Sequence, residues 1–117
     1  PIDVWNVSEI TDMSKLFYDK TNCNPDLSNW DTGKVANTEM MFLRATSFNG
    51  DLSKWNTGKV ADMGSMFYRA TSFNGDLSKW NTGEVTDMMS MFEEATSFTE
   101  KKFCPSAPEG VELTCPA

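Results

Sequence analysis

One stretch of the chain occurs twice, 25 residues apart, with almost no change. Residues 41–60 read MFLRATSFNGDLSKWNTGKV and residues 66–85 read MFYRATSFNGDLSKWNTGEV. Four apolar columns keep this spacing along the chain. Their members are Trp5, Trp30, Trp55 and Trp80; Phe17, Phe42, Phe67 and Phe92; Ile10, Val35, Val60 and Val85; and Leu16, Met41, Met66 and Met91. A repeat of this length is the signature of stacked units, so the sequence predicts about four of them.

A single repeat is too small to fold by itself. Each large apolar side chain contributes about 1.5–3 kcal/mol when it is buried. Ordering the backbone costs about 1–2 kcal/mol for every residue. Stacking resolves the deficit, because an internal repeat then buries both of its faces. We therefore expect the aromatic columns to form a continuous core, with ring stacked on ring.

Within a repeat, the spacing of apolar residues predicts a short helix. After Val60 they recur at offsets of three, six, seven and ten, at Met63, Met66, Phe67 and Ala70. Such residues share one face of a helix. Asn-Gly-Asp at 74–76 and Asn-Thr-Gly at 81–83 favour turns. Leu77 and Trp80 between them leave room for only a very short extended segment.

The three cysteines lie at the two ends of the chain. Cys23 stands where later repeats have Phe48, Phe73 and Phe98, so we interpret it as a buried free thiol that acts as a small hydrophobe. A bond to a neighbouring chain or to a preceding segment is the alternative. Cys104 and Cys115 are predicted to form a disulfide that stiffens the tail, which would require an oxidising compartment.

The tail itself, residues 100–117, departs from the repeat, and residues 1–99 hold the four copies. We expect the tail to cap the last repeat, because the apolar face of that repeat would otherwise meet water. Its large apolar residues are Phe103, Val111 and Leu113. The sequence thus predicts a four-repeat unit followed by a C-terminal cap.

Composition excludes several functions. Acidic residues outnumber basic ones by 17 to 10, giving a net charge of −7, which disfavours a nucleic acid partner. Histidine is absent, so the commonest general base and metal ligand is missing. No apolar run approaches the length of a membrane-spanning helix. Every carboxylate that could act in catalysis has a copy one repeat away, so we expect neither an enzyme nor a cofactor.

Two other repeated patterns leave alternatives open. Asp51 and Asp76 could bind calcium, although each repeat supplies few oxygens and lysines lie nearby; we name no metal ligands. Threonine columns could in principle order water, but threonine is also typical of turns and caps. Their members are Thr21, Thr46, Thr71 and Thr96, and Thr32, Thr57 and Thr82.

The repeat resembles that of a known family of surface proteins. The segment VADMGSMFYRATSFNGDLSKWNTGEVTDMMSMF, with ITDMSKLF and DLSNWDTG, is similar to BspA-type leucine-rich-repeat-like repeats, also found in mycoplasma-type surface lipoproteins. The resemblance extends to about Phe98. It implies a right-handed solenoid of short helices and very short parallel strands. Together with the residue pattern, it predicts an α/β solenoid at a cell surface or outside the cell.

The family implies adhesion or recognition of a protein or glycan, without catalysis, and carries over no ligand-binding residue. The alternative is a structural module that packs into an extracellular layer or filament. Residues after the Phe17 column vary and are free for contacts, so we name Leu43, Arg44, Tyr68 and Arg69 as a candidate surface. Asn6 begins an Asn-Val-Ser sequon and could carry a glycan on a eukaryotic secretory route.

Overall fold

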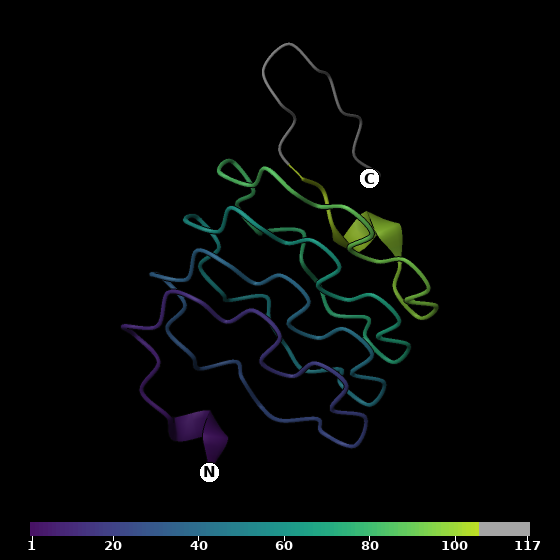
Figure 1. The fold of residues 1–117 in the computed structure, drawn as a ribbon, viewed down its shortest axis with the longest axis horizontal. Coiled ribbons are helices and arrows are strands. Elements are labelled where there is room, and N and C mark those ends of the chain that lie inside the picture. Colours follow the sequence, from purple (N-terminus) through teal and green to yellow (C-terminus); the bar gives the residue numbers. More distant parts are fainter. Residues whose placement is uncertain (106–117) are drawn as a thin grey trace.

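The computed structural model describes residues 1–105, in which the chain winds into coils that lie one beside the next (Figure 1). We number the coils from the N-terminus as residues 6–30, 31–55, 56–80 and 81–105. A 3-10 helix, η1 (Ile2–Val4), precedes the first coil. A second, η2 (Glu100–Lys102), lies in the last one. Residues 25 positions apart are therefore neighbours in space.

Hydrogen bonds between coils follow an alternating rule, which the third coil illustrates. Every second backbone N–H donates to a carbonyl of the next coil at 2.8–2.9 Å; these pairs are Met63–Asp87, Ser65–Met89, Phe67–Met91 and Arg69–Glu93. The intervening N–H groups of Met66, Tyr68 and Ala70 instead donate to the carbonyl three residues earlier. The segment is thus a run of tight turns whose remaining donors join the coils.

The α/β solenoid predicted from the sequence is wrong. Residues 1–105 contain no α-helix and no strand, only η1, η2 and isolated parallel bridges along Asp12, Asn37, Asp62 and Asp87. The apolar residues that follow Val60 do not form a helix. The turns bury the same side chains that a helix would have buried. Turns prevail because half of their donors bond to the next coil, whereas an α-helix directs its donors back along itself.

The turns require a left-handed backbone at two positions of each coil. The residues are Lys15 and Asp19, Met40 and Arg44, Ser65 and Arg69, and Ser90 and Glu94, with φ between 52° and 59°. This region costs a residue other than glycine about 1–2 kcal/mol. Its recurrence in every coil shows that the stacking contacts and the inter-coil hydrogen bonds offset this cost.

Aromatic columns form the core. In the Phe17 column, neighbouring rings lie 5.4–5.5 Å apart and within 6° of parallel. The rings of Trp30, Trp55 and Trp80 stack 6.4 Å apart. Each of these three indole N–H groups donates to a backbone carbonyl 28 residues earlier, so the buried polar atom is paired.

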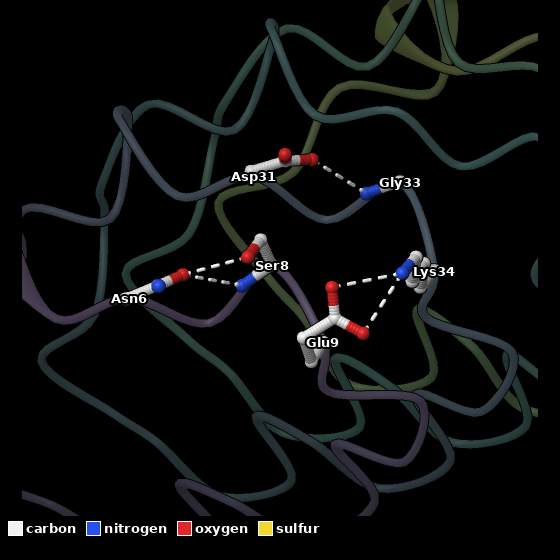
Figure 2. A network of polar contacts seen from close by, with 6 residues as sticks. All are labelled: Asn6, Ser8, Glu9, Asp31, Gly33 and Lys34. Atoms are coloured by element: carbon white, nitrogen blue, oxygen red, sulfur yellow. Dashed lines mark hydrogen bonds and ion pairs between the residues drawn. The ribbon is translucent and has the colours of Figure 1, made fainter.

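Asparagine and aspartate side chains close turns at three positions of the repeat. Each side-chain oxygen accepts a hydrogen bond from the N–H two residues later, as Asn6 does from Ser8 and Asp31 from Gly33. Figure 2 shows these two turns, together with the ion pair at 2.8 Å between Glu9 and Lys34 that connects the first and second coils. The polar surface thus helps to shape the coils as well as to solvate them.

The two ends of the stack differ. At the C-terminal end, the Phe103 ring packs edge-on against Phe92, and the Lys102 carbonyl accepts a hydrogen bond from the N–H of Leu77. At the other end Trp5 is 59% exposed. Cys23 is free, as expected, but it is exposed and not buried, because it lies at the outer end of the Phe48 column.

Candidate functional site

The candidate site is an open groove of about 570 Å³ that crosses all four coils. Two columns line it. The charged column consists of Asp19, Arg44, Arg69 and Glu94; the threonine column consists of Thr21, Thr46, Thr71 and Thr96. The two columns are separated by two residues in every coil, so each coil contributes one charged side chain and one hydroxyl. We call this feature the recognition groove.

The charged column lies next to the Phe17 column along the sequence of every coil. Each member lies two residues after the Phe17 column and occupies the second left-handed position of its coil. Its backbone is held between coils, as where the N–H of Arg44 donates to the carbonyl of Tyr68 at 2.8 Å. The side chains consequently project from a backbone fixed by the buried phenylalanines, which positions the charges although they are exposed.

Ion pairs divide the charged column into two halves. Arg44 lies 3.8 Å from Asp19, and Arg69 forms a hydrogen-bonded ion pair with Glu94. The hydrogen bond that the Arg69 guanidinium donates to the Glu94 carboxylate raises the pKa of Arg69 above its usual value. The groove therefore has two positive groups at its centre and one negative group at each end, with no net charge in this column.

The threonine column is exposed, except that Thr46 is half-buried. The Thr46 hydroxyl donates to the carbonyl of Thr21 at 3.4 Å, and the neighbouring Ser47 hydroxyl donates to the same carbonyl at 2.6 Å. By contrast, Thr32, Thr57 and Thr82 are buried within the stack. Only one of the two threonine columns can therefore meet a partner.

The lining offers hydrogen bonds and charge but no evident catalytic pair. Guanidinium groups donate in a fixed planar fork that suits carboxylate, sulfate or phosphate oxygens. Threonine hydroxyls both donate and accept. The carboxylates of Asp19 and Glu94 belong to opposite ends of the groove, and each faces an arginine. This arrangement can recognise an extended partner.

The sequence-predicted contact residues divide between the groove and its surroundings. Arg44 and Arg69 are exposed and line the groove. Tyr68 is half-buried, and the Arg69 guanidinium lies 5.2 Å from the centre of its ring. Leu43 is only 7% exposed, which leaves it little surface for a contact. The candidate surface named from the sequence left out Asp19 and Glu94, although their shared 25-residue column with the two arginines was a usable signal.

Other predicted residues lie elsewhere. Asn6 is exposed, and its side chain accepts hydrogen bonds from the N–H and the hydroxyl of Ser8. Glycosylation of Asn6 stays a prediction.

Cys115 lies outside the described residues, so its predicted bond to Cys104 also stays a prediction. Val111 and Leu113, the other apolar residues of the predicted cap, lie outside them too. Asp51 accepts a hydrogen bond from Ser53. Among residues 1–105, no cluster of three or more acidic, cysteine or histidine side chains could hold a metal ion.

The chain belongs to the family described as Mycoplasma protein of unknown function, DUF285, whose model matches residues 1–103. Membership fits a mycoplasma-type surface repeat protein, and the resemblance to BspA-type leucine-rich-repeat-like repeats stays a prediction. No curated protein and no solved structure matches the chain. Within the described part of the chain, no helix is long and apolar enough to cross a membrane.

Proposed function

We propose that this protein is a non-catalytic recognition module, secreted or held at a cell surface, that binds a protein or glycan through the recognition groove. The observation that carries the proposal is the groove itself, because its two columns cross all four coils on a backbone fixed by the core. Family membership supports a surface-associated role.

The charges of the groove describe what it would bind. Arg44 and Arg69 stand in adjacent coils, and coils joined by backbone hydrogen bonds lie about 5 Å apart. Two guanidinium groups at that spacing suit one anionic group of a partner, because each can donate to it while keeping its own carboxylate. Asp19 and Glu94 repel a polyanion, so the proposed partner carries an isolated negative group flanked by neutral or basic ones.

Binding of the labelled chain to a glycan array and to a panel of extracellular-matrix proteins tests the proposal. The double variant Arg44→Ala/Arg69→Ala is expected to lose at least about ten-fold in affinity, because two charge-assisted contacts disappear. The matched control is Lys54→Ala/Lys79→Ala, whose lysines line a different pocket with Asp76. Equal binding by both double variants, or no binding to any probe, contradicts the proposal.

A further inference from the structure

The recognition groove runs along the axis of the stack, because each coil contributes one residue of the charged column and one of the threonine column. Backbone hydrogen bonds join the coils beside the groove, as where the N–H of Arg69 donates to the carbonyl of Glu93 at 2.9 Å. Coils joined in this way lie about 5 Å apart. A partner that lies along the groove therefore meets a charged side chain and a hydroxyl at each interval of about 5 Å.

This interval distinguishes between classes of linear partner. An extended peptide returns to the same face every second residue, about 6.6 Å further on, so it loses register by about one coil over the length of the groove. A polyproline II peptide returns after three residues, about 9 Å further on, and meets only alternate coils. In a β-1,4-linked glycan, by contrast, each sugar extends the chain by the length of its ring, which is close to the spacing of the coils.

The width of the groove disfavours a bulkier partner. Its volume of about 570 Å³, over a length of about 20 Å for four coils, corresponds to a cross-section of about 30 Å². An α-helix rises about 5.4 Å per turn and so has nearly the right period, but its diameter with side chains is about 10–12 Å. A single glycan chain is only one sugar ring wide. Period and width together favour a glycan.

The threonine column offers groups that suit sugars. Within residues 1–105, the hydroxyls of Thr21, Thr71 and Thr96 make no hydrogen bond. Each of them can both donate and accept, as a sugar hydroxyl does. The threonine methyl group lies beside the hydroxyl, so the column also presents apolar surface to the C–H groups of a sugar ring. Neutral sugars can therefore be held along this column.

The two arginines retain donors for an anionic group. Arg69 uses its Nε for Glu94, and the Arg44 guanidinium lies 3.8 Å from Asp19 without a hydrogen bond. Since a guanidinium has five N–H donors, most of them remain available. One carboxylate or sulfate between Arg44 and Arg69 can accept from both. Asp19 and Glu94, one coil further out on either side, disfavour a second anionic group there.

We propose that the recognition groove binds a linear β-1,4-linked glycan along the axis of the stack, with one sugar for each coil and a single anionic sugar at Arg44 and Arg69. This inference rests on the proposed function and specifies the class of partner. The anionic group is a carboxylate or a sulfate, and the sugars beside Asp19 and Glu94 are neutral.

Calorimetric titration of the protein with defined tetrasaccharides tests the inference. The probes are the tetramer of β-1,4-linked glucose, its forms with one internal glucuronate or one internal glucose sulfate, and the tetramer of glucuronate. At least one singly anionic tetramer is expected to bind at least about ten-fold more tightly than the neutral one. It should also bind at least about five-fold more tightly than the fully carboxylated one, which Asp19 and Glu94 repel. Equal affinities for all tetramers overturn the inference.

Chain length and linkage test the register. The corresponding singly anionic disaccharide should bind at least about ten-fold more weakly than the tetramer, because it reaches only two coils. An α-1,4-linked tetramer with the same anionic group winds into a coil and should also bind more weakly. A disaccharide as tight as the tetramer, or an α-linked tetramer as tight as the β-linked one, overturns the alignment of one sugar with each coil.

Two variants separate the charged column from the threonine column. Arg44→Ala/Arg69→Ala should remove the preference for the singly anionic tetramer. Thr71→Val should weaken the neutral and the singly anionic tetramer by the same factor, about two- to five-fold, because it removes one hydroxyl. The fold should tolerate Thr71→Val, since this side chain is exposed. Unchanged binding by both variants overturns the inference.

A peptide probe separates this inference from the proposed function. The probe is an extended peptide of glycine and serine with one central glutamate. It should bind at least about ten-fold more weakly than the singly anionic tetramer, because its repeat does not match the coils. If the peptide binds through the two arginines and the tetramers do not, the glycan is overturned while the groove remains a recognition site.

Discussion

At the residue scale, the repeated Phe-Asn-Gly motif is a packing requirement. A Cβ added at Gly75 would lie 2.9 Å from two atoms of the Phe73 ring, and one at Gly50 would meet the Phe48 ring equally closely. These rings are fully buried and cannot move aside. The first coil has Pro25 at this position and Cys23 in place of the phenylalanine, so no ring crowds its larger residue.

Ser65 tests the left-handed positions directly, because its φ is 52° and its side chain makes no hydrogen bond within residues 1–105. Ser65→Gly should raise the free energy of unfolding by up to about 1 kcal/mol, since relief of the backbone strain exceeds the entropy that glycine loses. Ser65→Val should lower it by about 1–3 kcal/mol, because a β-branched residue is poorly accommodated there. Urea denaturation of both variants measures the difference. The reverse order would show that the turn has another geometry.

At the scale of the element, aspartate turns make stability depend on pH. The Ser hydroxyl and then the backbone N–H two residues later hold the pKa of four carboxyls below the usual value of 3.8; these are Asp12, Asp26, Asp51 and Asp76. Because the folded state binds the proton more weakly than the unfolded state, the stabilisation is complete above about pH 4. It is lost as pH falls through the lower pKa of the folded state.

We therefore expect the free energy of unfolding to decrease below about pH 4, with a shallower decrease when the four aspartates are replaced by asparagine. Asparagine closes the same turns at Asn6, Asn37, Asn56 and Asn81, so the replacements keep an acceptor. Chemical denaturation at steps between pH 7 and pH 2 gives the slopes. Identical slopes for the two proteins would assign the acid sensitivity to other groups.

The tryptophan column also acts as an element, because its members stack on one another. Trp55→Ala should destabilise the protein by about 3–5 kcal/mol, since its ring is buried between Trp30 and Trp80 and leaves a cavity. Trp5→Ala should cost less than about 1 kcal/mol, because Trp5 is largely exposed. Thermal and urea denaturation can compare the two variants. Equal losses of stability in the two variants would mean that stacking within the tryptophan column does not stabilise the core.

At the scale of the whole molecule, stability should scale with the number of coils. Deleting residues 41–65 joins Met40 to Met66, and nearly the same sequence follows the junction as in the intact chain. The remaining three coils should still unfold cooperatively, with the urea m-value reduced by about a quarter, because less surface is exposed on unfolding. A shortened chain without a cooperative transition would show that the middle coils are not interchangeable.

Sequence reasoning reached the candidate site only in part. Arg44 and Arg69 were recognisable because their column varies between coils beside the invariant phenylalanine column, so it is not needed for packing. Leu43 and Tyr68 follow the same column but lie more deeply in the structure. Their burial depends on the direction in which each turn points its side chains. The alignment of the repeats in the sequence does not reveal that direction. Asp19 and Glu94 share the column of the two arginines, but only the structure shows that this column and the threonine column line one groove.

The 25-residue period alone determined which residues are neighbours, because identical shapes 25 positions apart can pack only on one another. It also located the aromatic columns and the acidic turns. Only the tertiary structure decided how the backbone connects them. A helix and a run of turns bury the same apolar residues after Val60, so periodicity cannot distinguish them. The decision rests on hydrogen bonds between coils, which exist only once neighbouring coils are in place to accept them.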